Sequence, residues 1–447
     1  MTNTRELALD ILVDIDRNKN LSHLAINDTL SNYQYLEKKD RAFLSRLCRG
    51  TIENQIQIDY IINQFSKVKV NKCKPVIRAI LRMGVYQLRF MDQVPDSAVC
   101  NEAVKLAKKR GFKNLTGFVN GVLRTIARSK DEIKWPDENK KPVQALSVAY
   151  SMPEWLVKEW LKEYGMDVTK SMLEAFLIAK PTTIRVQKSK GSKEELVQML
   201  RDEGVTVTDG SYLKEACKIS GYDYLEGMEA FEEGRFQVQD ESSMLVGHLA
   251  APEEGMTILD VCSAPGGKSL HVADKLSGTG RVIARDLTPY KVEMIEDNIE
   301  RLGVTNMEAQ VFDALDFDEE MEEKADIVLA DLPCSGLGII GRKGDIKYNV
   351  SPEKMKELSK LQRDILKVVV RYVKKGGILM YSTCTINKEE NIKNAQWMCE
   401  ELGMEMVAFD DLMPEKLSLD TAKEGYIQLL PGQCDCDGFF IAKLRRL

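Results

Sequence analysis

Apolar positions in residues 1–140 repeat with the period of an α-helix. Leu7, Ile11 and Ile15 recur at four-residue spacing, which places them on one face of a helix. Similar stripes continue further along, and no proline occurs before Pro75. This pattern predicts an all-helical domain.

The pattern of apolar and polar residues changes after the helical region. Residues 129–144 are charged, contain two prolines and lack periodicity, which is typical of a linker. Residues 145–234 mix helical and strand patterns, with a strand expected over 182–187. A helix is expected from Ser192, because Glu195 three residues later completes a capping box. This region predicts a small α+β domain.

From residue 235 to the C-terminus, short continuous apolar runs alternate with helical segments. Short continuous apolar runs are typical of strands buried on both faces, as in a parallel sheet covered by helices. The expected parallel strands are 257–262, 280–286, 325–331 and 376–382, and the segments MEMVAF, YIQLLP and GFFIAKL are expected to close the sheet in antiparallel fashion. Residues 235–447 therefore predict a doubly wound, Rossmann-like α/β domain, which binds ligands at the carboxyl ends of its strands.

Composition narrows the class of protein. The chain has 447 residues, of which 44% are hydrophobic and 30% charged, as in multidomain soluble proteins. The N-terminus shows no basic stretch followed by an apolar one, and no uncharged apolar run approaches the ~20 residues that span a bilayer. Ten cysteines without a secretion signal indicate a reducing compartment. We therefore expect a cytoplasmic protein with free thiols and no membrane association.

Charge is distributed unevenly along the chain. The net charge is −6, yet the first 150 residues hold 26 Lys and Arg against 16 Asp and Glu. The remainder carries a net charge of −16. A basic first third favours a domain that meets phosphates, although solvated lysines on helix faces would give the same count. The densest basic stretches are 67–74 and 105–113.

A glycine-rich turn links the first expected parallel strand to a helix. This order places backbone N–H groups and a helix N-terminus beside a ligand. The dinucleotide pattern G-x-G-x-x-G is not met, because only Gly266 and Gly267 are present. The phosphate-loop pattern G-x-x-x-x-G-K-[ST] ends correctly at Ser269, but Cys262 stands where it needs its first glycine. The third interpretation is binding of S-adenosylmethionine.

Aspartates follow three successive strands of the same region. Asp286 ends the second strand, Asp313 follows MEAQVF, which is expected to be the third strand in chain order, and Asp331 ends the fourth, 325–331. Asp286 can accept hydrogen bonds from ribose hydroxyls, and Asp313 can meet an adenine amino group. One such residue is commonly a turn aspartate. Three at one sheet edge favour a nucleoside site, and hence S-adenosylmethionine as the cofactor.

Two cysteines also follow strands. Cys334, in ADLPCSG, comes just after the fourth strand, and Cys384, in YSTCT, comes just after the next. A lone cysteine is usually a small buried hydrophobe. Neighbouring strands lie ~5 Å apart, however, so both thiols can converge on one pocket beside the cofactor loop.

Two thiols facing a methyl donor suggest methylation of a pyrimidine at carbon-5. That carbon is not nucleophilic enough to take a methyl group unaided. A thiolate that adds to carbon-6 activates it, and a base must later remove the carbon-5 proton so that the thiolate leaves. Asp331 could hydrogen-bond N3 and the amino group of a cytosine and promote the addition.

The segments CSAPGGK, FDALDF, ADLPCSG, YSTCT and DGFFIAKL together resemble the RNA 5-methylcytosine methyltransferase family. In that family the Thr-Cys cysteine attacks and the Pro-Cys cysteine assists product release. The resemblance therefore implies that Cys384 is the nucleophile and that Cys334 assists release. It implies cofactor binding by Cys262, Ser263, Ala264, Pro265, Gly266, Gly267, Lys268, Asp286, Asp313 and Asp331.

The resemblance extends over nearly the whole chain. DRAFLSRLCRG and NEAVKLAKKRGFKNLTGFVNGVLR resemble the NusB antitermination-factor domain, a helical RNA-binding fold. PTTIRVQ and FEEGRFQVQDESS are similar to an RNA-binding segment of the methyltransferases, with Gln187 where asparagine is usual. A NusB-like domain before such a core resembles the RsmB/Sun family, which methylates 16S ribosomal RNA of the small subunit. The implied partner is ribosomal RNA, and we expect the chain to act as a monomer.

One segment departs from the family pattern. Gly432 and Cys436 stand where the family usually has histidine and threonine. Cys434 and Cys436 lack a nearby histidine or second cysteine pair, so no metal site is expected. Two alternatives stay open: methylation of transfer RNA by the same core, and a non-catalytic RNA-binding or antitermination module with a decayed methyltransferase fold. Cofactor binding without methyl transfer would support the second.

Overall fold

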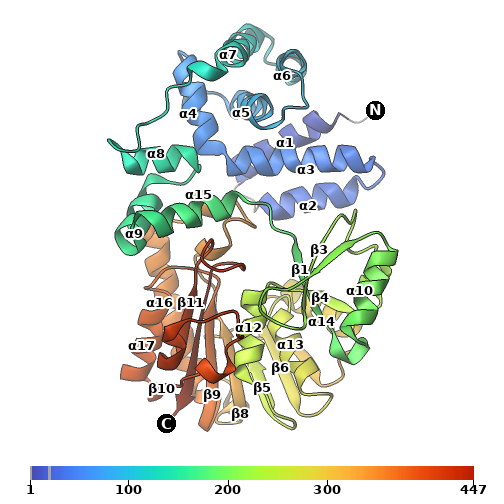
Figure 1. Cartoon of the computed structure of the whole chain (residues 1–447), viewed down its shortest axis with the longest axis vertical. Coiled ribbons are helices and arrows are strands. Elements are labelled where there is room, and N and C mark those ends of the chain that lie inside the picture. The colour runs from blue at the N-terminus through green and yellow to red at the C-terminus, as the bar shows by residue number, and fades with distance from the viewer. Residues whose placement is uncertain (1–2, 19–21) are drawn as a thin grey trace. The chain divides into compact units, whose positions relative to one another are not determined.

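The computed structural model describes residues 3–18 and 22–447, and the chain folds into two compact units (Figure 1). Unit 1 comprises residues 1–178 and 340–349, and unit 2 comprises 179–339 and 350–447. Among the described residues, no helix is long and apolar enough to cross a membrane.

Unit 1 is built from helices packed around α5. Its elements are α1 (Thr4–Asn18), α2 (Ser22–Asn32), α3 (Lys38–Glu53), α4 (Gln55–Phe65), α5 (Pro75–Phe90), α6 (Asp96–Lys109), α7 (Thr116–Arg128), α8 (Pro142–Ala149), α9 (Glu154–Leu177) and the late α15 (Ile346–Asn349). Helix α5 packs against α1, α3, α4, α6 and α7, and Gly84 allows the Leu123 side chain to lie against its backbone. The helical prediction for the N-terminal region is confirmed.

The segment 340–349 joins unit 1 from a distant point of the chain. Lys347 is 2% exposed, and its ammonium donates a hydrogen bond of 2.8 Å to the Glu53 carbonyl at the end of α3. Burial lowers the pKa of Lys347 to about 8. Asp345 accepts a hydrogen bond of 2.9 Å from the Ser22 amide. Hydrophobic patterning gave no sign that this stretch leaves the α/β region.

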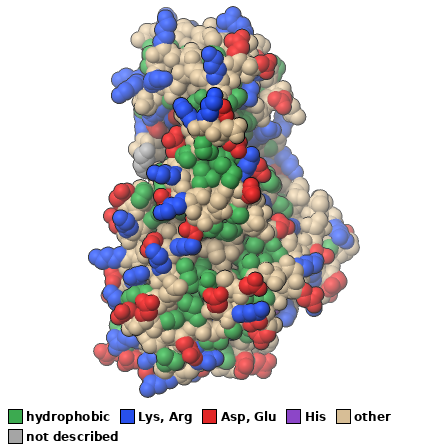
Figure 2. Space-filling model, turned by 60° about the vertical axis from the view of Figure 1, so that its left-hand side comes forward, with side chains coloured by type: hydrophobic (Ala, Val, Ile, Leu, Met, Phe, Trp, Pro, Cys, Tyr) green, Lys and Arg blue, Asp and Glu red, His purple; other side chains and the backbone are tan. Residues whose placement is uncertain are grey.

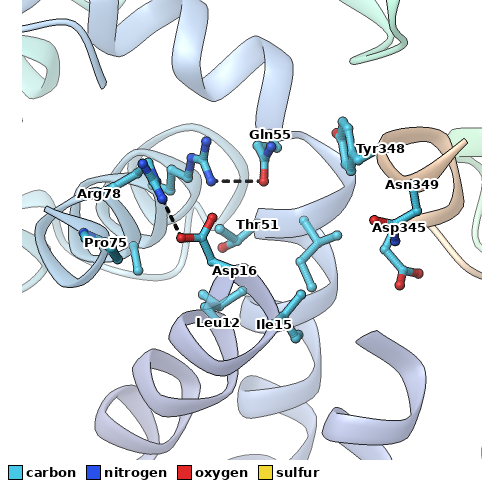
Figure 3. Close-up of a pocket in the computed structure, with 13 residues that line it drawn as sticks. Leu12, Ile15, Asp16, Thr51, Gln55, Pro75, Arg78, Asp345, Tyr348 and Asn349 are labelled. Atoms are coloured by element: carbon cyan, nitrogen blue, oxygen red, sulfur yellow. Dashed lines mark hydrogen bonds and ion pairs between the residues drawn. The ribbon is translucent and has the colours of Figure 1, made fainter. Parts of the chain in front are cut away.

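A cavity of about 110 Å³ lies where this segment meets α1, α3 and α5 (Figure 3). Arg78 pairs with Asp16, and Arg82 donates to Gln55, in its wall. All of its lining residues belong to unit 1, so the cavity is separate from the strand-edge site described below.

Unit 2 begins with a small antiparallel sheet. Its elements are β1 (Thr182–Val186), α10 (Lys193–Asp202), β2 (Thr206–Asp209), β3 (Ala216–Ser220), α11 (Glu229–Glu232) and β4 (Phe236–Val238), with strand order β2-β3-β1-β4. The expected capping box opens α10, where Ser192 and Glu195 bond reciprocally. One face of the sheet and α10 share an apolar core that includes Ile184, Leu200 and Phe236.

The larger sheet of unit 2 carries the candidate site. Its strands are β5 (Thr257–Asp260), β6 (Arg281–Asp286), β7 (Met307–Val311), β8 (Ala325–Asp331), β9 (Val373–Thr383), β10 (Met404–Met406), β11 (Tyr426–Leu429) and β12 (Phe439–Arg446). Five strands are parallel in the order β9-β8-β5-β6-β7, and β12 lies antiparallel to β9 and pairs with both β10 and β11. The expected doubly wound sheet with an antiparallel closing part is confirmed.

Helices cover both faces of this sheet (Figure 1). One apolar core includes residues of α12 (Glu241–Ala250), α13 (Gly267–Lys275) and α14 (Pro289–Leu302). The other includes residues of α16 (Pro352–Val369) and α17 (Ile392–Glu401). The sheet is thus the middle of three layers, and its carboxyl edge is left to the connecting loops.

Candidate active site

The two thiols singled out by the sequence lie together. The Cys334 and Cys384 sulfurs are 3.3 Å apart. Strands β8 and β9 are parallel neighbours with Asp331 opposite Ser382, so the residues after each strand emerge side by side. The Gly338 amide donates a hydrogen bond of 3.0 Å to the Cys384 carbonyl, which joins the two loops.

The thiol pair is electrostatically asymmetric. The hydrogen bond with Cys384, burial, and the negative charges of Glu390 and Asp331 raise the pKa of Cys334 well above its ordinary value. Cys334 therefore keeps its proton at neutral pH.

Asp331 links the thiols to the glycine-rich turn. Its carboxylate accepts hydrogen bonds from the Ser382 hydroxyl at 2.8 Å and from the Lys268 ammonium at 2.6 Å. Burial of Lys268 lowers its pKa, but the charge of Asp331 outweighs this effect and the pKa is raised overall. Sequence patterns placed Lys268 in the cofactor loop, and the structure shows in addition that it is paired with a carboxylate beside the thiols.

The loop Cys262–Lys268 connects β5 to α13 and is held by backbone bonds to neighbouring strands. The Ser263 amide donates to the Arg285 carbonyl, and the Ala264 amide donates to the Asp286 carboxylate, both at 2.9 Å. Gly266 has φ of 97°, a conformation that glycine adopts without strain, and α13 begins directly after it. The loop therefore presents the N-terminus of α13 at the sheet edge, as the sequence predicts.

Asp260 is a buried carboxylate that the sequence did not single out. It ends β5, accepts bonds from the Ser269 hydroxyl and the Cys262 amide, and burial raises its pKa to about 6. The only sequence signal was its place at the end of an apolar strand. Its hydrogen bonds with Ser269 and Cys262 hold the glycine-rich turn in place.

Asp286 and Asp313 lie at the far end of the same edge. Asp286 is buried and accepts a hydrogen bond of 2.9 Å from the Lys291 ammonium, whereas Asp313 is half-buried and caps the Leu315 amide. Strand β7 neighbours β6, with Val311 opposite Asp286. The apolar side chains around these carboxylates are unusually exposed: Leu287 57%, Tyr290 66%, Val311 52% and Leu315 43%. Carboxylates beside exposed apolar side chains fit a nucleoside, whose ring is apolar and whose ribose donates hydrogen bonds.

Strand order arranges these groups in a line. From one end the edge carries Cys384 after β9, Cys334 after β8, the loop after β5, Asp286 after β6 and Asp313 after β7. Three strand spacings separate β8 from β7, or ~14 Å. A ligand the size of a nucleoside with an extended tail spans that distance, so the sheet brings all the sequence-predicted site residues to one edge.

Other predicted features lie elsewhere. Arg185, in the strand thought to bind RNA, is 0% exposed and bonds to Gln239 and Asp274, so its side chain does not face a solvent-borne ligand. The four lysines of the stretch 67–74 are exposed in unit 1. On the face shown in Figure 2, Lys and Arg side chains are interspersed with Asp and Glu. The described part of the chain holds no cluster of three or more His, Cys, Asp or Glu placed to bind a metal ion.

Comparison with known proteins identifies three domains. Family models match the NusB family over residues 2–128, the ferredoxin-like domain of RsmF/B-like methyltransferases over 152–222, and the 16S rRNA methyltransferase RsmB/F over 248–445. The chain thus carries a NusB-like domain, a ferredoxin-like domain and a methyltransferase domain.

Two solved structures are similar to this chain in fold. The protein PH0851 aligns with a TM-score of 0.83 and 26% identity, over 100% of this chain and 99% of the other. NSun6 from Pyrococcus horikoshii, solved with SFG, shares the fold over 66% of this chain and 98% of its own, with a TM-score of 0.58 and 23% identity.

Curated relatives match over the full length. A probable ribosomal RNA small subunit methyltransferase B from Bacillus subtilis (strain 168) is 37% identical, over 100% of this chain and 99% of the relative. A Synechocystis protein with the same description is 32% identical over 100% of both chains. The ribosomal RNA small subunit methyltransferase B of Citrobacter koseri is 30% identical over 92% of both. On this evidence the chain belongs to the ribosomal RNA small subunit methyltransferase B family.

Proposed function

We propose that the protein transfers a methyl group from S-adenosylmethionine to carbon-5 of a cytosine in 16S ribosomal RNA, through a covalent adduct between Cys384 and carbon-6. The observation that carries the proposal is the 3.3 Å separation of the Cys334 and Cys384 sulfurs at two strand ends. The relatives' descriptions support RNA of the small ribosomal subunit as the substrate. The sequence resemblance supports cytosine as the base.

S-adenosylmethionine, when bound, supplies an electrophilic methyl group. We assign its ribose to Asp286 and its adenine to the surface formed by Asp313, Leu287 and Val311. The loop Cys262–Lys268 lies between this surface and the thiols in the strand order, where it can hold the rest of the cofactor.

Attack is assigned to Cys384. A thiolate is the nucleophilic form of cysteine, so the Cys384 thiol has to lose its proton before it attacks. The Cys384 sulfur forms a bond to carbon-6, and the ring electrons move to carbon-5, which takes the methyl group. Asp331, held by Lys268 and Ser382, faces the same edge and is assigned to the N3 and amino side of the cytosine. The target base has to leave its helix to reach these groups.

Release is assigned to Cys334. The carbon-5 proton must be removed, so that its bonding electrons re-form the ring double bond and the carbon–sulfur bond to Cys384 breaks. Cys334 has to be a thiolate to take this proton. The hydrogen bond with the Cys384 sulfur, the largest cause of the raised pKa of Cys334, is lost once that sulfur is bonded to carbon-6, so Cys334 can give its own proton to solvent at this stage and then accept the carbon-5 proton. Cys334 stands beside the attacking sulfur, where that step takes place.

A comparison of two variants tests the covalent mechanism. Cys384→Ala is expected to abolish methyl transfer and to form no covalent complex, because the attacking atom is gone. Cys334→Ala is expected to accumulate protein bound to RNA, because attack proceeds and release does not. Each variant is incubated with 16S ribosomal RNA and S-adenosylmethionine carrying a labelled methyl group, and adducts are resolved on a denaturing gel.

Cys399→Ala is the matched control, since Cys399 is a partly buried thiol in α17 at no predicted site. It should behave like the unaltered protein. Trapping in Cys384→Ala instead would reverse the two roles. If both thiol variants stay active and neither traps RNA, the covalent mechanism is wrong, and transfer RNA offered in parallel shows whether the substrate class is wrong.

A further inference from the structure

The mechanism above leaves one fully buried carboxylate of the site unused. Glu390 is 0% exposed and lies in the polar stretch after Cys384. Its carboxylate accepts hydrogen bonds from the Ser335 amide at 2.8 Å, the Ser335 hydroxyl at 2.6 Å, the Asn387 amide at 2.8 Å and the Gln362 amide at 3.2 Å. All four donors are neutral groups. Burial of a carboxylate is costly, so an arrangement that supplies four donors to one carboxylate calls for an explanation.

The donors hold the loop that carries Cys334. Ser335 directly follows this thiol and gives Glu390 both its backbone and its side-chain hydrogen. Gln362 of α16 donates to Glu390 and also to the Pro333 carbonyl at 2.8 Å, on the other side of the thiol. Both chain neighbours of Cys334 are therefore fixed through Glu390 or through its partner.

The next residue does the same for the attacking thiol. Asn391 accepts a hydrogen bond from the Thr383 hydroxyl at 2.5 Å and donates one of 3.0 Å to the Thr385 carbonyl. These two residues flank Cys384. Glu390 and Asn391 thus hold the two sulfurs from adjacent positions, and the Ser335 and Thr385 hydroxyls, 2.7 Å apart, close the link between the loops.

We propose that Glu390 is a positioning residue that holds the Cys334 thiol against the attacking sulfur, so that release of the methylated base, rather than attack on it, depends on Glu390. The inference rests on the proposed covalent function. Its negative charge also contributes to the raised pKa of Cys334. A glutamine in its place would keep one acceptor oxygen but present N–H groups on the other side. Either the Ser335 amide and Gln362, or the Ser335 hydroxyl and Asn387, would then lose their shared acceptor.

Glu390→Gln tests the proposal. Misplacing Cys334 should slow release, so steady-state turnover on 16S ribosomal RNA should fall about tenfold or more. A denaturation-resistant protein–RNA adduct should accumulate, as expected for Cys334→Ala. The rate of adduct formation in a single turnover should stay within about threefold of the unaltered protein, because attack by Cys384 is preserved. Glu389→Gln is the matched control, since Glu389 is an exposed neighbour of the same charge.

Ser335→Ala is a second, milder variant. It keeps the amide bond to Glu390 and removes the hydroxyl contacts with Glu390 and Thr385, so it should trap less RNA than Glu390→Gln but more than the control. A thermal unfolding curve accompanies each variant. A merely structural role would lower attack and release together without trapping, and that result overturns the proposal.

The outcomes also separate this inference from the mechanism on which it rests. If Cys334→Ala traps RNA and neither Glu390→Gln nor Ser335→Ala does, the covalent function stands and the positioning role is wrong. If Cys334→Ala does not trap RNA either, the assignment of release to that thiol fails first.

Discussion

Unit 2 contains two pairs of neighbouring thiols, and their surroundings differ. Cys334 and Cys384 are 50 residues apart in sequence and meet at the carboxyl edge of two parallel strands. Cys434 and Cys436 are near neighbours in the loop between β11 and β12, where they share a hydrogen bond. Closeness of two sulfurs is therefore not what distinguishes a catalytic pair.

The difference lies in what holds each pair and what each faces. The first pair lies beside Asp331 and Lys268 and is held by buried hydrogen bonds. In the second pair Cys436 is also buried, and the Lys180 ammonium donates a hydrogen bond of 2.8 Å to its carbonyl, but the neighbouring Asp435 is 68% exposed and pairs with Lys218 at the surface. A hydrogen bond from Cys436 lowers the pKa of Cys434 to about 7. A thiol with a lowered pKa thus lies in the pair that we do not assign to methyl transfer.

The largest expected contrast between the pairs is in methyl transfer itself. Cys384→Ser should lower the rate by at least about 10³-fold, because a serine hydroxyl is a far weaker nucleophile than a thiolate. Cys434→Ser should change the rate less than twofold. Both are measured by incorporation of labelled methyl into 16S ribosomal RNA. Equal losses in the two variants would remove the distinction between the pairs.

A smaller effect is expected where the two loops touch. A Cβ at Gly338 would lie 1.9 Å from the Gly438 carbonyl oxygen and 2.9 Å from that of Cys384. Gly338→Ala should therefore lower the free energy of unfolding by about 1–3 kcal/mol and slow turnover about tenfold. Chemical denaturation and turnover assays check both values. Gly121→Ala, at a helical glycine with no neighbour in the way, should cost nothing, and equal behaviour of the two variants would contradict the argument.

The smallest expected effect concerns the second thiol pair and is the rate at which iodoacetamide modifies Cys434. The hydrogen bond from Cys436 lowers the pKa of Cys434 to about 7, whereas burial raises the pKa of the partly buried Cys399. Iodoacetamide should therefore modify Cys434 about tenfold faster than Cys399 at neutral pH. The rate should rise with pH around a midpoint near 7, and Cys436→Ala should move that midpoint upward by removing the hydrogen-bond donor. Peptide mapping by mass spectrometry gives the rates. A Cys434 rate no faster than that of Cys399 would show that its thiol is not acidic.

Patterns of apolar residues predicted the layers, the parallel strands and the edge on which the site lies. This succeeds because strand ends in a parallel sheet face one way, so Asp286, Asp313, Asp331 and the two thiols could be placed without knowing any contact. The spacing of residues along the chain carried the information.

The sequence pattern did not reveal contacts between residues that are far apart in the chain. Glu390 and Asn391 stand in a polar stretch that gives no sign of a role, yet both are buried: Glu390 is bonded to Ser335 in the loop after β8, and Asn391 to Thr385 beside Cys384. Arg185 looked like a basic residue in an RNA-binding strand, but Asp274 lies against it. A charged residue is expected to be exposed unless a hydrogen-bond or ion-pair partner is known. No local sequence pattern identifies a partner that lies many residues away.

The path of residues 340–349 limits how the molecule can be dissected. The chain enters unit 2 after residue 178, returns to unit 1 for this segment and leaves again after residue 349. Removing the N-terminal helices alone would leave Lys347, which is 2% exposed, without the Glu53 carbonyl that accepts its hydrogen bond. An isolated methyltransferase domain would need this segment shortened or replaced as well. Because the segment belongs to unit 1 and its two ends continue into unit 2, an insertion there would affect both units.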